Sequence, residues 1–163
     1  MANALTICRI MLSFLLLVPP ALSPAFLGLY AVAGATDMLD GFIARKTGTE
    51  SELGARLDSI ADFTLAVVCL VKILPAVSVP LWLWIWIAII VLVKLANIAS
   101  GYMMQKRLVM LHTAANKAAG LVVFLVPFAI PLTGGITIPA IPACVVATFA
   151  AIQEGHFIRT GNA

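Results

Sequence analysis

The chain has 163 residues, of which 63% are hydrophobic and only 10% are charged, with a mean hydropathy of +1.11. A soluble domain of this size carries roughly 25% charged residues and cannot hide so much apolar surface from water. This composition argues against soluble and disordered classes, and a net charge of +3 gives no indication of nucleic-acid binding. At roughly 20 residues per span, the length allows at most about six membrane-spanning helices. We therefore predict an all-α, polytopic membrane protein, with six transmembrane helices in one bundle and a single domain over residues 1–163.

Prolines and charged residues divide the chain into six apolar segments. In chain order, the predicted helices cover residues 4–22, 24–46, 51–74, 80–105, 112–130 and 138–157. Pro19 and Pro20 lie in the first turn, and Pro131 begins the last one. We expect the first segment to be a retained helix rather than a cleaved signal peptide, because no convincing A-x-A cleavage site follows it.

Basic residues gather on one side of the predicted helices. That side holds the N-terminus, the loops after the second and fourth helices, and the C-terminus, with Arg9, Arg45, Lys46, Arg56, Lys106, Arg107, Lys117 and Arg159. Because Lys and Arg favour the cytoplasmic side, we predict a multi-pass protein of the cell membrane with both termini in the cytoplasm. Lys94 falls deep in the fourth helix, where a charge is costly, and the sequence assigns it no role.

All four aspartates fall within residues 37–62, in the second and third predicted helices. Asp37 and Asp40 are spaced i,i+3, whereas Asp58 and Asp62 are spaced i,i+4, so each pair shares one helix face. In an antiparallel hairpin, one residue of each pair lies about 9–10 Å from the intervening turn and the other about 14–16 Å. The two pairs are therefore predicted to meet at matching depths.

Four facing carboxylates in a low dielectric need cations to remain ionised. The basic residues nearby in the sequence, Arg45, Lys46 and Arg56, fall at helix ends and are too few and too shallow for a purely structural salt-bridge cluster. A site for a hard divalent cation explains the cluster better, with Mg²⁺ or Mn²⁺ as the expected ion. Zinc is disfavoured because no histidine lies near the cluster.

Small residues accompany the aspartates. Gly41 and Ala44 lie beside the first pair, and Gly54 lies one turn before Asp58. Small side chains let helix backbones approach closely or admit a ligand against the helix. We interpret these three positions as places of ligand access.

The pattern Asp37-x2-Asp40-Gly41-x2-Ala44-Arg45-x8-Gly54-x3-Asp58-x3-Asp62 resembles the complete signature of the CDP-alcohol phosphatidyltransferases. The size and the six-helix layout resemble this family over almost the whole chain. The resemblance implies a homodimeric enzyme that moves a phosphatidyl group from CDP-diacylglycerol to an alcohol and releases CMP, with its active site facing the cytoplasm. It also implies residue roles: two divalent ions held by Asp37, Asp40, Asp58 and Asp62, a general base in Asp62, and a cytidine and diphosphate pocket lined by Gly41, Ala44, Arg45 and Gly54.

The acceptor alcohol is less well defined. Residues 3–9, Asn-Ala-Leu-Thr-x-x-Arg, are similar to the start of phosphatidylglycerophosphate synthases, which favours glycerol 3-phosphate. Residues 57–63 lack the usual proline and lysine of those enzymes and resemble phosphatidylserine synthases, so serine or inositol (phosphate) is the alternative. A phosphate-bearing acceptor needs fixed cations, for which the candidates are Arg9, Arg107, Lys117 and Arg159; cytoplasmic anchoring is the other explanation for these residues.

Two other classes of membrane protein also use acidic helices. A membrane prenyltransferase holds a magnesium diphosphate between aspartate-rich helices, but its motifs usually lie far apart in sequence. A cation- or proton-coupled transporter has no reason to keep Gly41, Ala44, Arg45 and Gly54 at fixed offsets. The phosphatidyltransferase interpretation explains more of the pattern than either.

Overall fold

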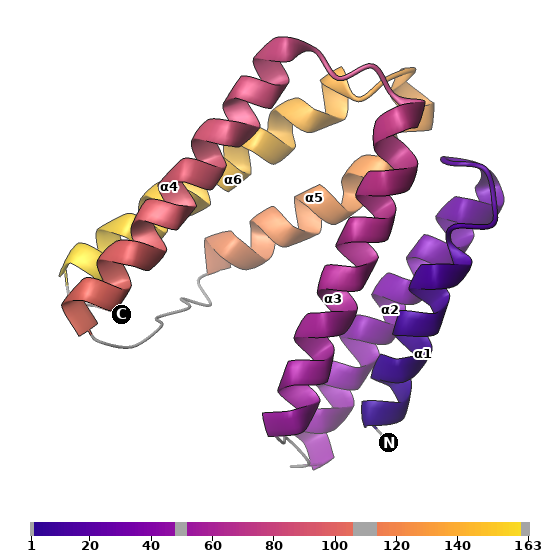
Figure 1. The fold of residues 1–163 in the computed structure, drawn as a ribbon, viewed down its shortest axis with the longest axis horizontal. Helices are drawn as coiled ribbons and strands as arrows, with labels where there is room; N and C mark the ends of the chain where they lie inside the picture. Colours follow the sequence, from indigo (N-terminus) through magenta and orange to yellow (C-terminus); the bar gives the residue numbers. More distant parts are fainter. Residues whose placement is uncertain (1, 48–51, 106–113, 161–163) are drawn as a thin grey trace. The chain divides into compact units, whose positions relative to one another are not determined.

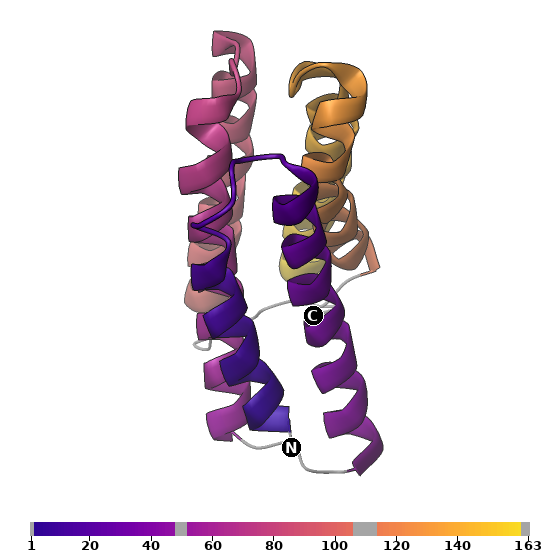
Figure 2. The same ribbon diagram turned by 90° about the vertical axis from the view of Figure 1, so that its right-hand side faces the viewer.

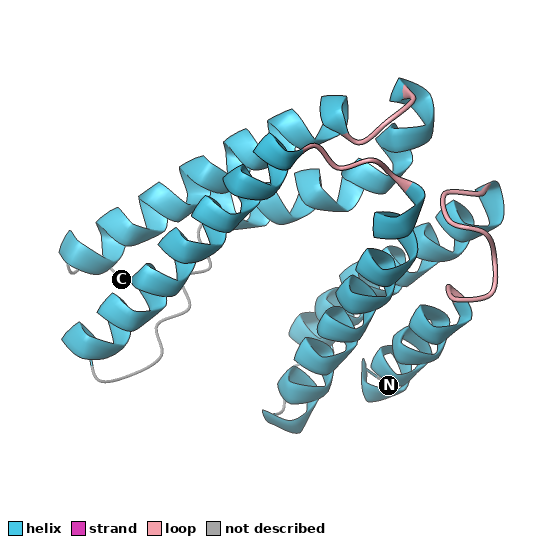
Figure 3. Ribbon diagram, turned by 45° about the horizontal axis from the view of Figure 1, so that its top comes forward, coloured by secondary structure: helices cyan, strands magenta, loops and turns pink. Residues whose placement is uncertain are grey.

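The computed structural model describes residues 2–47, 52–105 and 114–160. Within these ranges the chain forms helices joined by turns and loops, with no strand (Figure 3). The helices are α1 (Ala2–Leu15), α2 (Pro24–Thr47), α3 (Glu52–Ile73), the short 3-10 helix η1 (Leu74–Ala76), α4 (Leu81–Gln105), α5 (Ala114–Thr133) and α6 (Thr137–Thr160). The all-α prediction is confirmed.

Three helices are long and apolar enough to cross a membrane, judged over the described residues. They are the stretches Leu81–Gly101, Ala114–Thr133 and Thr137–Thr160 of α4, α5 and α6. A shorter apolar stretch, Thr6–Leu15, lies in α1. Large hydrophobic side chains are exposed along most of the helices, as expected of surfaces that face lipid. The protein is therefore an integral membrane protein.

The first helix is shorter than the sequence predicts, ending at Leu15 rather than at residue 22. Pro19 and Pro20 cause this, because each disfavours helical geometry in the residue before it. The amides of Leu17 and Val18 already bond to carbonyls three residues back, at 3.0 and 3.1 Å, which closes the helix with tight turns.

The next helix then begins with a side-chain cap. The Ser23 hydroxyl accepts a hydrogen bond from the Phe26 amide at 3.2 Å, and Pro24 occupies the first helical position. Ser23 and Pro24 therefore determine where the loop after α1 ends and α2 begins.

The chain divides into two compact units, Met1–Val77 and Ser78–Ala163. In the N-terminal unit, α1 packs along both α2 and α3, and these are the principal helix contacts (Figures 1 and 2). Its buried apolar side chains include Leu16, directly after α1, then Phe26, Tyr30 and Ala33 of α2, and Ala61 and Val68 of α3. The single domain over residues 1–163 stays a prediction.

In the C-terminal unit, α6 packs against both α4 and α5. Leu83 and Ile90 of α4 are buried against Ala140 and Cys144 of α6. Small residues on α6 let the helices approach closely. The fifth helix runs on to Thr133, past the residue 130 expected from Pro131, and Gly134 follows it at φ +70°, a conformation that favours glycine after a helix end.

A polar cluster joins the three helices of the C-terminal unit. Lys94 Nζ of α4 lies 3.2 Å from Asn116 Oδ1 of α5 and 3.3 Å from Glu154 Oε2 of α6. The Asn116 amide nitrogen lies 3.4 Å from the same Glu154 oxygen. Lys94, which the sequence left without a role, therefore pairs within its own chain.

Removing one partner of this ion pair is expected to destabilise the protein. Lys94→Met leaves the Glu154 carboxylate, whose side chain is 11% exposed, without its cation, at a cost of about 3 kcal/mol. The double variant Lys94→Met/Glu154→Gln removes both charges and should recover most of that loss. The measurement is the unfolding midpoint in detergent of the wild type, both single variants and the double variant. Equal unfolding midpoints for all four proteins would contradict a stabilising role of the Lys94–Glu154 ion pair.

Candidate metal and catalytic site

The site begins with a polar stripe on the otherwise apolar helix α1. Thr6, Arg9 and Ser13 are spaced i, i+3 and i+7, so they share one face, and all three are buried. The Ser13 hydroxyl donates a hydrogen bond to the Arg9 carbonyl oxygen at 2.8 Å. The stripe turns inward because α1 packs on both α2 and α3, which places the Arg9 guanidinium inside the N-terminal unit.

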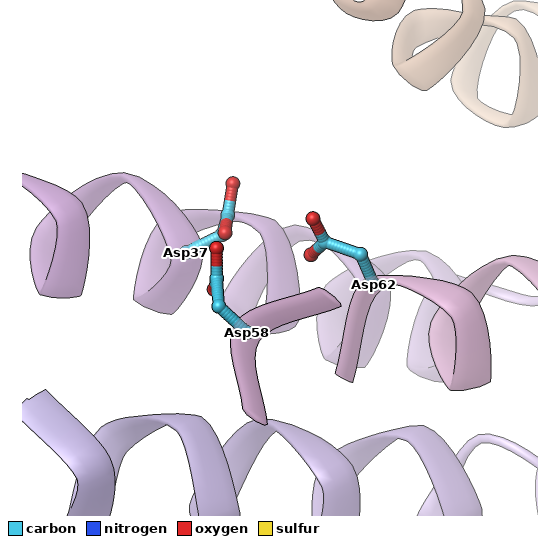
Figure 4. Close-up of side chains that lie close together, drawn as sticks. All are labelled: Asp37, Asp58 and Asp62. Carbon is cyan, nitrogen blue, oxygen red and sulfur yellow. The ribbon is translucent and has the colours of Figure 1, made fainter. Parts of the chain in front are cut away.

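Three aspartates converge beside this stripe. Asp37 comes from α2, and Asp58 and Asp62 come from successive turns of α3 (Figure 4). One carboxylate oxygen from each lies within 4.8 Å of the other two. The structure thus brings together three of the four aspartates that the helical spacing places on common faces.

The Arg9 guanidinium pairs with all three carboxylates. Its Nη1 lies 2.7 Å from Asp37 Oδ1 and 2.7 Å from Asp62 Oδ1, and its Nη2 lies 3.0 Å from Asp58 Oδ1. Arg9 is a cation at the cluster that the sequence analysis does not identify as a partner of the aspartates, but one arginine against three carboxylates still leaves an excess of negative charge. The spacing of Thr6, Arg9 and Ser13 is the signal that could have identified Arg9.

The two sides of the cluster differ in accessibility. The Arg9 side chain is fully buried, whereas the side chains of Asp37, Asp58 and Asp62 are 44%, 46% and 57% exposed. The guanidinium therefore covers the closed side of the carboxylates, and their remaining surface is open. The three carboxylates and Arg9 together carry a formal charge of −2.

The other site residues are placed less completely. Asp40, Gly41, Ala44 and Arg45 lie on the backbone of α2, but their side chains are outside the described residues. Gly54 lies on α3, half-buried and one turn before Asp58.

Of the candidate acceptor cations, Arg9 belongs to the cluster itself. Arg107 is outside the described residues, and Lys117 and Arg159 are exposed on the C-terminal unit. Among these candidates whose side chains are described, only Arg9 contacts the aspartates.

The donor set fits a hard divalent cation. Carboxylate oxygens are the ligands that Mg²⁺ and Mn²⁺ prefer, and the three aspartates bring them within 4.8 Å of one another on an open side. The formal charge of −2 left after Arg9 matches the charge of one such ion. Chemically, an open cluster of this kind suits the binding of phosphate groups through the metal.

These observations define an integral membrane protein with a carboxylate site at a helix interface. The sequence pattern of the family described as CDP-alcohol phosphatidyltransferase matches residues 1–154. The chain belongs to this family.

Individual relatives match over short segments. Human cardiolipin synthase (CMP-forming) is 46% identical over 55 residues, which is 33% of this chain and 18% of that protein. A rice chloroplastic CDP-diacylglycerol–glycerol-3-phosphate 3-phosphatidyltransferase is 55% identical over 42 residues, 26% of this chain and 12% of that protein. A CDP-diacylglycerol–serine O-phosphatidyltransferase of Methanocaldococcus jannaschii is 69% identical over 26 residues, 16% of this chain and 13% of that protein. No solved structure matches.

Proposed function

We propose that this protein transfers a phosphatidyl group from CDP-diacylglycerol to an alcohol acceptor and releases CMP. The observation that carries the proposal is the convergence of Asp37, Asp58 and Asp62 in a chain whose family is named for this chemistry. Family membership also favours this class over the prenyltransferase and transporter alternatives.

In the proposed reaction, the acceptor hydroxyl attacks the phosphorus atom that carries the diacylglycerol. A new P–O bond forms, the bond to the phosphate of CMP breaks, and CMP leaves with that electron pair. Asp62 accepts the hydroxyl proton, and its exposed carboxylate supports this role. Asp37, Asp40, Asp58 and Asp62 would hold two ions of Mg²⁺ or Mn²⁺, which would supply positive charge against the diphosphate and the departing CMP.

The small and basic residues around the cluster complete the proposed donor site. Gly41, Ala44, Arg45 and Gly54 line the cytidine and diphosphate pocket. Gly54 supports this assignment because it lies one turn from Asp58 and has no side chain, which is the property that admits a ligand close to a helix backbone.

We also propose that all six helices span the cell membrane, in a homodimer. At about 1.5 Å per residue, α2 and α3 reach about 36 and 33 Å, which exceeds a hydrocarbon core of about 30 Å. Helix α1 covers only about 21 Å, and the turns of residues 16–23 follow it before α2 begins. The excess of Lys and Arg on one side supports a cytoplasmic position for both termini and for the open side of the site.

This topology predicts opposite labelling at the two ends of α6. In a variant without Cys8, Cys69 and Cys144, a cysteine replacing exposed Thr137 should react with an impermeant thiol reagent on intact cells. A cysteine replacing Thr160, exposed at the other end, should react only after the cells are permeabilised. The reverse pattern would contradict the orientation and the release of CMP to the cytoplasm.

Glycerol 3-phosphate is the acceptor we favour. Relatives from rice, Cereibacter sphaeroides and Haemophilus influenzae carry this acceptor in their names, with 44–55% identity over the matched segments. Serine is the second candidate, supported by the 69% identity to the archaeal relative over its short segment. Inositol or inositol phosphate is the remaining alternative from the sequence.

A direct assay tests both the reaction and the acceptor. The purified chain is given CDP-diacylglycerol with glycerol 3-phosphate, serine, inositol phosphate or inositol, and CMP is measured. We expect CMP release that depends on glycerol 3-phosphate, and conversion of CMP and phospholipid back to CDP-lipid in the reverse direction. No acceptor-dependent CMP in any of the four mixtures would contradict the proposed function.

A further inference from the structure

We propose that Arg9 is the built-in counter-cation of the aspartate cluster: it holds the three helices of the N-terminal unit together in the absence of metal and weakens the binding of divalent cations. This inference concerns regulation of the site assigned above and rests on the proposed function for its biological meaning. Its physical basis is the placement of one buried guanidinium against three carboxylates from two other helices.

The geometry first shows how Arg9 can assemble the site. Its planar guanidinium presents several donors at fixed angles, so one side chain can bond more than one carboxylate. Nη1 reaches Asp37 on α2 and Asp62 on α3 at 2.7 Å each, while Nη2 reaches Asp58 on α3 at 3.0 Å. Helices α2 and α3 each make their main contact with α1. Because Arg9 lies on α1, its ion pairs join the same helices that this packing joins.

The electrostatics then determine the effect on metal binding. Three carboxylates within 4.8 Å repel one another strongly unless a cation is present. Arg9 supplies one positive charge from the closed side, and a divalent cation has access from the open side. The two cations repel each other across the carboxylates, so Arg9 lowers the affinity for metal while it removes the need for metal in folding.

Removing the charge of Arg9 tests this directly. In the full chain in detergent, Arg9→Gln should lower the metal-free unfolding midpoint and should bind Mn²⁺ about tenfold more tightly, measured from the free-ion signal by electron paramagnetic resonance. Added Mn²⁺ should raise its unfolding midpoint more than that of the wild type. Arg9→Lys keeps the charge and should hold the Mn²⁺ affinity within about threefold of the wild type, which a merely structural role does not predict.

Lys72→Gln is the matched control. It removes one positive charge from the same unit, about 15 Å along α3 from Asp62, where Lys72 donates to the Leu17 carbonyl at 2.9 Å. Its Mn²⁺ affinity should stay within twofold of the wild type. An Arg9→Gln variant with unchanged or weaker Mn²⁺ binding, or one that merely matches Lys72→Gln, overturns the inference.

A charge-balanced variant covers the case in which Arg9→Gln does not fold. Arg9→Gln/Asp58→Asn restores the formal charge of −2 without the arginine, and it should fold without metal. If this variant also fails to fold, charge balance is not the role of Arg9 and the inference is overturned. The test is separate from the proposed function: tighter Mn²⁺ binding by Arg9→Gln in a protein that forms no CMP supports the inference alone, whereas acceptor-dependent CMP with unchanged Mn²⁺ binding supports the function alone.

Discussion

Asp37→Ala should abolish CMP release, with a loss of at least about 10³-fold, because it removes a hard ligand from the proposed metal site. Losses of 10–100-fold are typical of residues that only support a ligand, so the larger loss distinguishes the two roles. Asp40→Ala and Asp58→Ala should behave in the same way and should also weaken the binding of CDP-diacylglycerol. The measurement is CMP formation by the purified variants, with folding checked by the unfolding midpoint.

Chelation and a neighbouring substitution provide the controls for this result. EDTA should abolish the activity of the wild type, and Mg²⁺ or Mn²⁺ should restore it. Thr36→Ala changes the residue beside Asp37, but the Thr36 hydroxyl donates a hydrogen bond to the Ala33 carbonyl of its own helix, at 2.7 Å, so activity should remain within a few-fold. Full activity after exhaustive chelation, or ordinary turnover by folded Asp37→Ala, would show that the metal assignment is wrong.

Asp62→Asn should lower kcat by about 10²–10⁴-fold while keeping much of the affinity for CDP-diacylglycerol, as expected when a general base is lost. Asp62 has the most exposed side chain of the three described aspartates, at 57%, so an acceptor hydroxyl has access to it. Asparagine keeps the shape and one coordinating oxygen but cannot accept the proton.

The split between turnover and binding decides the role of Asp62. Single-turnover rates and binding of the donor lipid are measured on the same preparation of Asp62→Asn, with Asp58→Ala as the comparison that should lose both. If Asp62→Asn turns over normally, or fails only because donor binding collapses, then Asp62 is a metal ligand alone and another group takes the proton.

The sequence by itself determined the class of this protein and most of its candidate site. An apolar composition with few charges admits little besides a helical membrane protein, because backbone groups in lipid must bond within their own segment. The spacing of the aspartates placed them on helix faces, since helical periodicity is a local property. In the structure, α1 packs against both neighbouring helices, and Asp37, Asp58 and Asp62 come together there, in agreement with the faces that the spacing predicts.

Only the tertiary structure decided which basic residues form ion pairs with the acidic residues. Arg9 meets Asp62 across 53 positions in the sequence, and Lys94 meets Glu154 across 60. Several other basic residues carry the same charge, and nothing in their local pattern distinguishes them as partners. The partner of a buried charge depends on which helix faces pack together, and that packing is a property of the whole unit rather than of any one segment.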